Sequence, residues 1–271
     1  MQKKILYLLA AIIIIAVAAI LILLSESGSS SSAALVAYDN KIVPQYLLAQ
    51  LSVPNNVSNA VNATQSEEQG IITNMTNTAV KSPPMYTSSG KPIVLYIGAE
   101  YCPFCAAERW AMVIALKRFG TFTGLRYMTS GSNDVYPNTP TFTFYNSTYT
   151  SSYIRFVPVE LTTNNGPPYT QLQTPNASQN STMSTLNPSG AIPFIDIANI
   201  SVQVGANYNP GVVFAGATWN STASELSNPQ SLQAKSIVAA ANLFTAQICK
   251  ATNNTPQSVC GQPYVAALEK A

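Results

Sequence analysis

The stretch GKPIVLYIGAEYCPFCAAERWAMVIALKRFG, residues 90–120, predicts the local architecture around which the domain is built. Residues 92–99 form a continuous apolar run rich in β-formers, which is typical of a strand buried on both faces. A Cys-Pro-Phe-Cys motif follows at 102–105, and the apolar run after it is too long for a strand. Pro103 suits the first turn of a helix, and Gly120 suits the position just past its end. We therefore expect a strand, a turn with two cysteines, and a helix.

The other expected elements follow from composition and hydrophobic period. Residues 124–130 are predicted to be the next strand, which would complete a βαβ unit with a right-handed crossover. Residues 131–190 are polar and rich in Tyr, Thr, Asn and Pro, so we expect a long insertion that ends in a loop from Thr162 to Gly190. Further expected elements are a helix at 43–51, a strand at 153–161, adjacent strands at 191–199 and 200–206, and a final helix at 231–248.

The charge balance and the absence of histidine exclude several classes of function. The chain has 271 residues, 13 Lys and Arg against 11 Asp and Glu, and a formal net charge of +2. Only 9% of its residues are charged, so no basic face is available for nucleic acid. Histidine is absent, which removes the commonest general base and the commonest metal ligand. Most hydrolase and metalloenzyme interpretations are thereby excluded.

The amino-terminal region predicts a membrane anchor. Residues 5–24 are twenty apolar residues, enough for a helix of about 30 Å that spans a bilayer. Lys3 and Lys4 precede this run, so the positive-inside rule places residues 1–4 in the cytoplasm as a short stub. The alternative is a signal peptide cleaved near Ala33. Both interpretations export the domain.

The predicted domain organisation continues on the outer face of the cell membrane. A flexible Ser-rich linker at 25–34 would join the single-pass anchor to an extracellular domain at 35–271, with its core at 91–248. The even number of four cysteines suits an oxidising compartment. N-x-S/T triplets spread along this part fit glycosylation and begin at Asn56, Asn62, Asn74, Asn146, Asn176, Asn180, Asn199, Asn220 and Asn253.

The first cysteine pair has the properties of a reactive dithiol. A Cys at a helix start faces unpaired backbone N–H groups and the positive end of the helix dipole, which lowers its pKa. Cys105 lies one turn later, where it can attack a mixed disulfide formed by Cys102. Two alternatives remain open: half of a zinc site completed by Cys249 and Cys260, and a purely structural disulfide.

The second cysteine pair is expected to be structural. Cys249 and Cys260 bracket the end of the last helix, so a disulfide between them would fix the C-terminal tail against that helix. A second redox pair that exchanges electrons with the first is the alternative. Glu108 and Arg109, on the helix after the motif, are expected to be solvated surface charges. The alternatives are that they pair with each other or guide a substrate.

The segment AEYCPFC resembles the active site of the thioredoxin superfamily, in which the first cysteine is the nucleophile and the second resolves. The resemblance implies that Cys102 and Cys105 take these roles and that Pro193, in GAIPFIDI, is a cis proline facing them. The position of the buried acid of thioredoxins is here Tyr96, although Glu100 lies nearby.

Residues 90–125 and the spacing ICKATNNTPQSVC are also similar to a more particular group. This group is an archaeal, membrane-anchored thioredoxin-like family catalogued as a domain of unknown function (number 929), seen in crenarchaeal thermoacidophiles. The expected fold class is therefore α/β and thioredoxin-like, with a mixed central sheet flanked by helices, a long polar insertion and one preceding transmembrane helix.

The expected function is thiol-disulfide exchange on exported proteins that carry thiols or disulfides. A redox partner, in the membrane or outside it, would reset the Cys102–Cys105 pair, and residues 5–24 would bind the lipid bilayer. No cofactor, metal or nucleic acid is expected. The alternative is a glycosylated thioredoxin-like scaffold or binding protein whose Cys-Pro-Phe-Cys disulfide is not catalytic.

Overall fold

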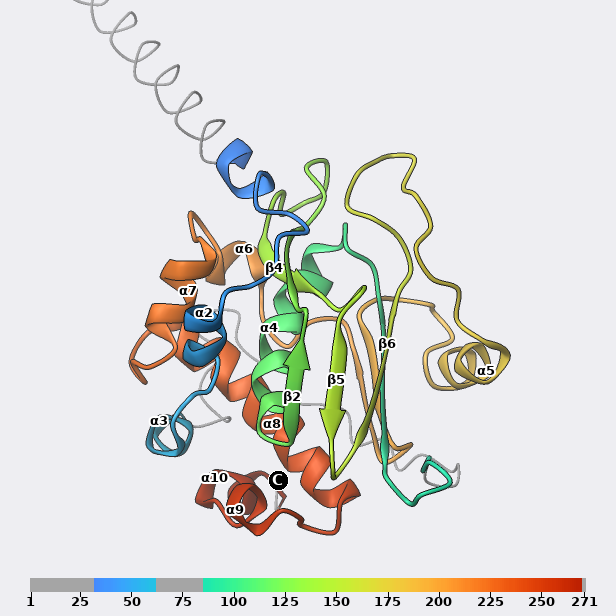
Figure 1. Ribbon diagram of the computed structural model, residues 1–271, viewed down its shortest axis with the longest axis vertical. Helices are drawn as coiled ribbons and strands as arrows, with labels where there is room; N and C mark the ends of the chain where they lie inside the picture. Colours follow the sequence, from blue (N-terminus) through green and yellow to red (C-terminus); the bar gives the residue numbers. More distant parts are fainter. Residues whose placement is uncertain (1–31, 62–84, 270–271) are drawn as a thin grey trace, which may run out of the picture. The chain divides into compact units, whose positions relative to one another are not determined.

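The computed structural model of the chain describes residues 32–61 and 85–269 (Figure 1). The chain divides into two compact units, residues 1–38 and 39–271. In the first unit, residues 32–36 are helical, and the backbone N–H of Tyr38 donates to the carbonyl of Leu35. All the elements discussed below belong to the second unit.

A four-stranded mixed sheet carries the centre of the second unit, in the strand order β6-β1-β7-β8. Strand β1 (Ile93–Gly98) pairs in parallel with β6 (Arg155–Glu160) and antiparallel with β7 (Phe194–Ile197). Strand β8 (Ser201–Val204) is antiparallel to β7. Two separate two-stranded sheets contain β2 (Gly120–Thr123) with β5 (Thr148–Ser151), and β3 (Arg126–Thr129) with β4 (Pro140–Thr143).

Helices cover both faces of the four-stranded sheet. Figure 1 shows α4 and α8 on one side of it and α5 on the other. The helices, in chain order, are α2 (Gln45–Gln50), α3 (Asn55–Ala60), α4 (Pro103–Lys117), α5 (Ala177–Leu186), α6 (Pro210–Val213), α7 (Trp219–Glu225), the π-helical segment η2 (Ala234–Val238) that leads into α8 (Ala239–Ala251), α9 (Gln257–Cys260) and α10 (Pro263–Glu269).

Alternate residues of β1 pack into two different layers. Leu95 and Ile97 are buried on the face toward α5, in a cluster that also includes Phe194 of β7. Tyr96 points the opposite way, and its ring packs edge-on against Phe144. Because successive side chains of a strand lie on opposite faces, a strand that is covered on both sides must be apolar throughout. This explains the continuous apolar run at 92–99.

Helix α4 is buried along most of its length, where it packs against α8 and β4. Every residue from Ala106 to Leu116 is buried. The Trp110 indole N–H donates to the carbonyl of Pro140 over 2.8 Å, and the Thr141 hydroxyl donates to the carbonyl of Ala106 over 2.7 Å. These two bonds join the helix to β4 and satisfy polar groups that would otherwise be buried without a partner.

Several local predictions are confirmed. The strand expected at 92–99 and the short helix at 43–51 are present as β1 and α2. Strands β7 and β8 form the expected adjacent antiparallel pair. Pro103 occupies the first turn of α4. Gly120 does not end this helix, however, because α4 stops at Lys117 and Gly120 begins β2.

The predicted fold class is wrong in the form stated. Residues 124–130 were expected to join the central sheet beside β1, but β3 pairs with β4 in a separate sheet. Strand β2 directly follows α4 and pairs with β5, so the chain turns away from β1 at this point. The parallel neighbour of β1 is β6, which lies much later in the chain. The structure is a mixed α/β arrangement with three sheets, and a thioredoxin-like fold is not confirmed.

The transmembrane part of the fold prediction has no support among the described residues. No helix in residues 32–61 or 85–269 is long and apolar enough to cross a membrane. The predicted anchor at 5–24 and most of the predicted linker at 25–34 lie outside these ranges.

The segment expected as an insertion, 131–190, contributes to the central sheet. It contains β4, β5 and β6. The expected loop from Thr162 to Gly190 contains α5, whose start carries a capping box between Asn176 and Gln179. That helix was missed because it buries no residue completely and therefore shows no strong apolar period.

Cys249 and Cys260 form the predicted disulfide, which links α8 to α9. Cys249 is fully buried, and Cys260 is nearly so. The bond fixes the short C-terminal helices α9 and α10 against α8.

Glu108 is a buried acid that holds a distant loop against α4. Its side chain has no exposure, and its Oε2 accepts from the backbone N–H of Asn207 over 3.0 Å. The neighbouring Tyr208 hydroxyl donates to the carbonyl of Ala107. Burial raises the pKa of Glu108 from 4.5 to about 8, although the Asn207 bond opposes this shift. Glu108 is thus neither solvated nor paired with Arg109, contrary to expectation.

Removing the disulfide is expected to destabilise the fold. The bridge closes a loop with a sequence separation of 11, and its loss in Cys249→Ala/Cys260→Ala should lower the free energy of unfolding by about 3 kcal/mol. Urea denaturation under non-reducing conditions measures this change. A loss below about 1 kcal/mol would contradict the structural role of the bridge.

Stability is expected to fall as pH rises from about 4 to about 8. The pKa of Glu108 is higher in the folded chain than in the unfolded chain, so folding takes up a proton in this range. The stabilisation is fully present below the unfolded pKa and is lost as pH rises through about 8. At about 1.4 kcal/mol for each pKa unit, the shift from 4.5 to about 8 lets Glu108 contribute up to about 5 kcal/mol to the pH dependence.

Glu108→Gln should flatten this dependence in urea denaturation measured across the pH range. Glu225→Gln is the matched control, because Glu225 is exposed on α7. The explanation fails if both variants retain the same slope as the unmodified chain.

Candidate thiol site

The reactive cysteine of the predicted pair lies at the start of α4. Cys102 is the N-cap residue, and its Sγ accepts from the backbone N–H of Cys105 over 3.3 Å. Its thiol also lies 3.8 Å from the carbonyl oxygen of Ile192, to which it donates. Both cysteines are buried, but Cys102 keeps 5% exposure while Cys105 has none, so Cys102 is the less enclosed of the two.

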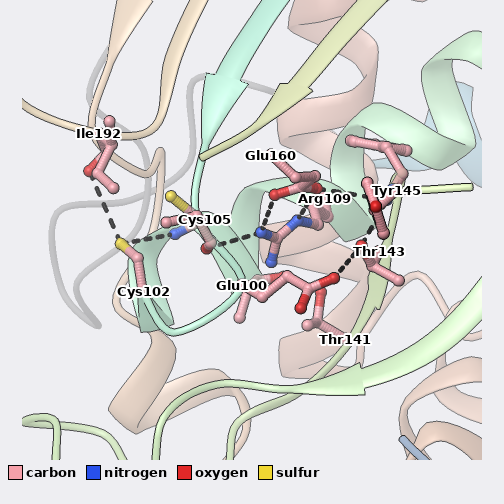
Figure 2. A network of polar contacts seen from close by, with 12 residues as sticks. Glu100, Cys102, Cys105, Arg109, Thr141, Thr143, Tyr145, Glu160 and Ile192 are labelled. Carbon is pink, nitrogen blue, oxygen red and sulfur yellow. Dashed lines mark hydrogen bonds and ion pairs between the residues drawn. The ribbon is translucent and has the colours of Figure 1, made fainter. Parts of the chain in front are cut away.

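Pro193 lies in the same part of the fold as Cys102. The residue before it, Ile192, contacts Cys102 although the two are 90 residues apart in the chain. The Ile192–Pro193 peptide is cis, as expected for this proline. The contact from Cys102 to Ile192 brings together the start of α4 and the start of β7 (Figure 2). The structure therefore places all three predicted catalytic residues, Cys102, Cys105 and Pro193, at one edge of the sheet.

The two sulfurs have opposite tendencies to ionise. A hydrogen bond from the Cys105 side chain is the main cause that lowers the pKa of Cys102, and the backbone N–H groups of Cys105 and Phe104 act in the same direction. Burial raises the pKa of Cys105 well above its ordinary value. Both cysteines are free thiols. Of the two thiols, Cys102 therefore loses its proton more readily than Cys105.

A fully buried ion pair lies beside the cysteine pair. Arg109 donates from Nε to Glu160 Oε1 over 2.9 Å and from Nη2 to Glu160 Oε2 over 2.7 Å, and neither side chain is exposed (Figure 2). Nη2 also donates to the carbonyl of Ala99 over 2.7 Å. Burial would lower the pKa of Arg109, but Glu160 outweighs it and keeps the guanidinium charged.

The positive charge of Arg109 acts on both thiols. Arg109 is four residues after Cys105, so the two side chains lie on the same face of α4. Its charge lowers the pKa of Cys102 and opposes the rise in the pKa of Cys105. In this arrangement, a guanidinium held by a carboxylate favours negative charge on the sulfurs without exposing a cation to solvent.

Two further ionisable groups surround this pair. Glu100 is 3% exposed, and its Oε1 accepts from the Thr143 hydroxyl over 2.6 Å. Burial raises the pKa of Glu100 to about 7. The fully buried Tyr96 hydroxyl has no hydrogen-bond partner among the described residues, and the Arg109 guanidinium lies 5.8 Å from the centre of its ring. The pKa of Glu100 is therefore close to neutral pH, so this carboxyl group can exchange a proton near the ion pair. Burial raises the pKa of Tyr96 well above its ordinary value.

Gly98 makes room for the Tyr96 ring. A Cβ at Gly98 would lie 2.1 Å from the Tyr96 hydroxyl oxygen. Gly98 also pairs with Glu160 across the parallel strands. A side chain at this position would therefore displace a ring that packs beside Arg109.

The remaining predicted sites are separate from this centre. Cys249 and Cys260 are bonded to each other, so they do not join Cys102 and Cys105 in a four-cysteine zinc site. In the described ranges, no group of three or more His, Cys, Asp or Glu side chains could hold a metal ion. Of the nine sequons, Asn62 and Asn74 lie outside the described residues and Asn199 is half-buried, while the exposed ones are Asn56, Asn146, Asn176, Asn180, Asn220 and Asn253.

Sequence reasoning missed the Arg109–Glu160 pair. Arg109 was expected to be solvated, and Glu160 was placed in a strand without a role. The available signal was their surroundings: both charges interrupt strongly apolar elements in a chain that has few charged residues. Charges at such positions are expected to be paired when they are buried.

Part of the chain matches the model of a known family. The model of a family described as Domain of unknown function (DUF929) matches residues 77–187. This range includes the Cys102–Cys105 pair, Arg109 and Glu160, but it ends before Pro193. No significant match was found among curated proteins or among solved structures. The match supports the resemblance to that family over these residues, and it shows neither the thioredoxin superfamily nor an archaeal origin.

Breaking the buried ion pair should cost stability and change the thiol chemistry. Arg109→Met leaves the Glu160 carboxylate buried without its partner, so the free energy of unfolding should fall by about 3–5 kcal/mol. The pKa of Cys102, measured from the ultraviolet absorbance of its thiolate, should rise, because Arg109 lowers it.

The double variant Arg109→Met/Glu160→Gln is the matched control for stability. It removes both charges, so it should recover part of the lost free energy while the pKa of Cys102 stays high. The assigned role is wrong if Arg109→Met leaves the Cys102 pKa unchanged.

Proposed function

We propose that the chain is a thiol-disulfide oxidoreductase that acts on polypeptides carrying thiols or disulfides. The observation that carries the proposal is the free Cys102 thiol at the N-cap of α4, with its pKa lowered and with Cys105 one turn behind it. Nucleophilic cysteines are expected at helix starts, since the thiolate is the reactive form. The resemblance of AEYCPFC to thioredoxin-superfamily active sites supports the same chemistry.

The proposed exchange proceeds in two balanced steps. The Cys102 thiolate attacks one sulfur of a substrate disulfide, forms a mixed disulfide, and releases the other substrate sulfur as a thiolate that takes up a proton. Cys105 loses its proton and attacks Cys102 Sγ, which breaks the mixed disulfide. The second substrate sulfur leaves as a thiol with that proton, and Cys102–Cys105 becomes the disulfide.

The same steps in reverse oxidise a substrate dithiol. In that direction the Cys102–Cys105 disulfide takes two electrons from the substrate, and a second dithiol–disulfide protein restores it. The proposal places the activity outside the cytoplasm, on exported proteins. That location depends on the predicted anchor at 5–24, which lies outside the described residues.

The buried groups fit the resolving step. Cys105 needs to lose a proton at a site without solvent, and its pKa is raised by burial. Arg109 favours the thiolate that forms there, and Glu100, with a pKa of about 7, lies in the same polar network. The resemblance to thioredoxins would place a single buried acid at the position of Tyr96. Here this network of buried groups lies beneath the cysteine pair instead.

A trapping experiment tests the proposal. Cys105→Ala should accumulate a covalent mixed disulfide with a scrambled test protein, because the Cys102 thiolate attacks one of its non-native disulfides and no second sulfur can then resolve the adduct. Cys102→Ala is the matched control and should form none, although it keeps Cys105 and the structural disulfide. The adducts are counted by non-reducing electrophoresis and mass spectrometry.

The unmodified chain should reshuffle the scrambled protein, and both variants should be defective. If Cys105→Ala traps nothing and the unmodified chain reshuffles nothing, the alternative is supported: a scaffold whose cysteine pair is not catalytic.

A further inference from the structure

Two aromatic residues close to Cys102 in the chain each pack against a second aromatic ring. We call Tyr101, Phe104, Tyr136 and Tyr169 the aromatic rim. Tyr101 and Phe104 flank Cys102 in the chain. The Tyr169 ring stacks on Tyr101 with 4.1 Å between centroids, and Tyr136 meets Phe104 edge-on at 5.9 Å. Phe104 is 37% exposed, which is unusual for a large apolar side chain in the first turn of a buried helix.

The rings are held in place by the loops that carry them. The backbone N–H of Gly131 donates to the carbonyl of Tyr101 over 2.8 Å, which joins the loop at 131–138 to the start of α4. The Asn133 side chain donates to the carbonyl of Gly166 over 3.3 Å, which joins this loop to the loop at 163–170. A Cβ at Gly211 would lie 2.2 Å from the Tyr136 ring, so the ring lies directly on that backbone.

The segments around Cys102 carry almost no charge. The loops at 131–138 and 163–170 and the segment 187–193 before β7 contain one charged residue, Asp134, and no Lys or Arg. Val135, beside Tyr136, is 64% exposed. A substrate approaching Cys102 through these segments therefore meets aromatic rings, backbone groups, uncharged polar side chains and one carboxylate.

From these observations, and resting on the proposed oxidoreductase function, we propose that the site selects unfolded polypeptide segments in which an aromatic or other large apolar residue lies next to the target cysteine. Aromatic rings pack favourably on other rings, edge-on or offset, and on apolar side chains. An anionic tripeptide thiol such as glutathione would find no cation in these segments and would meet the Asp134 carboxylate. The charge pattern thus favours an uncharged aromatic peptide over a small acidic thiol.

The selectivity is measured with mixed-disulfide peptides that differ only in the residue before the cysteine, which is Phe, Ser or Asp. The expected order of kcat/KM is Phe, then Ser, then Asp, with Phe about tenfold above Ser. Glutathione disulfide should react more slowly than the Phe peptide. The inference is overturned if the three peptides react within about twofold of one another, or if glutathione disulfide reacts fastest.

Variants of the rim identify the residues responsible. Tyr169→Ser and Tyr136→Ser lie outside the Cys-Pro-Phe-Cys motif, and each should bring the Phe-to-Ser ratio of kcat/KM toward one. Tyr46→Ser is the matched control, since Tyr46 is 59% exposed on α2. It should keep the full ratio. If neither rim variant changes the ratio, the rim is not the origin of any selectivity found.

Failure of this inference is distinguishable from failure of the proposed function. A chain that exchanges disulfides with every peptide at equal rates retains the function and loses the selectivity. A chain that reacts with no peptide and with no small disulfide loses both.

Discussion

The structure around the cysteines depends on one buried ion pair. Arg109 on α4 and Glu160 at the end of β6 are both fully buried, and two hydrogen bonds join them. Two charges without solvent are tolerated only when they satisfy each other, so this contact fixes α4 relative to β6. The third Arg109 bond, to Ala99, fixes the turn between β1 and the cysteine motif. Helix, sheet and turn thus meet at one guanidinium.

The chemistry of the site follows from that placement. Cys102 lies at the helix start, where backbone N–H groups stabilise its thiolate, while Cys105 faces the interior one turn behind it. The Arg109 charge favours ionisation of both sulfurs without making the surface basic. The loops at 131–138 and 163–170 and the segment 187–193 contain one charged residue, Asp134. In the proposed function, buried groups set the reactivity of the cysteines, and the aromatic rim contacts the substrate.

Much of the local structure could be predicted from residue patterns. The apolar run at 92–99 predicted β1, and proline and cysteine spacing predicted the start of α4. The Cys249–Cys260 disulfide and the cis bond at Pro193 were expected from spacing and resemblance. Strand pairing was not predictable in the same way: residues 124–130 look like a partner for β1, yet β6 takes that place. Any apolar strand of suitable length satisfies the local pattern, and only packing selects among them.

The sequence by itself determined where a helix begins beside two cysteines, because capping and hydrophobic period depend on neighbours a few residues apart. It also determined that histidine chemistry is absent. Only the tertiary structure decided that Glu108, Arg109 and Glu160 are buried. Most of α4 is covered by other elements, so its sequence has no polar face that would distinguish exposed charges from buried ones. Arg109 and Glu160 lie 51 residues apart in the chain. They come into contact only because β6 pairs with β1 and α4 packs against β6.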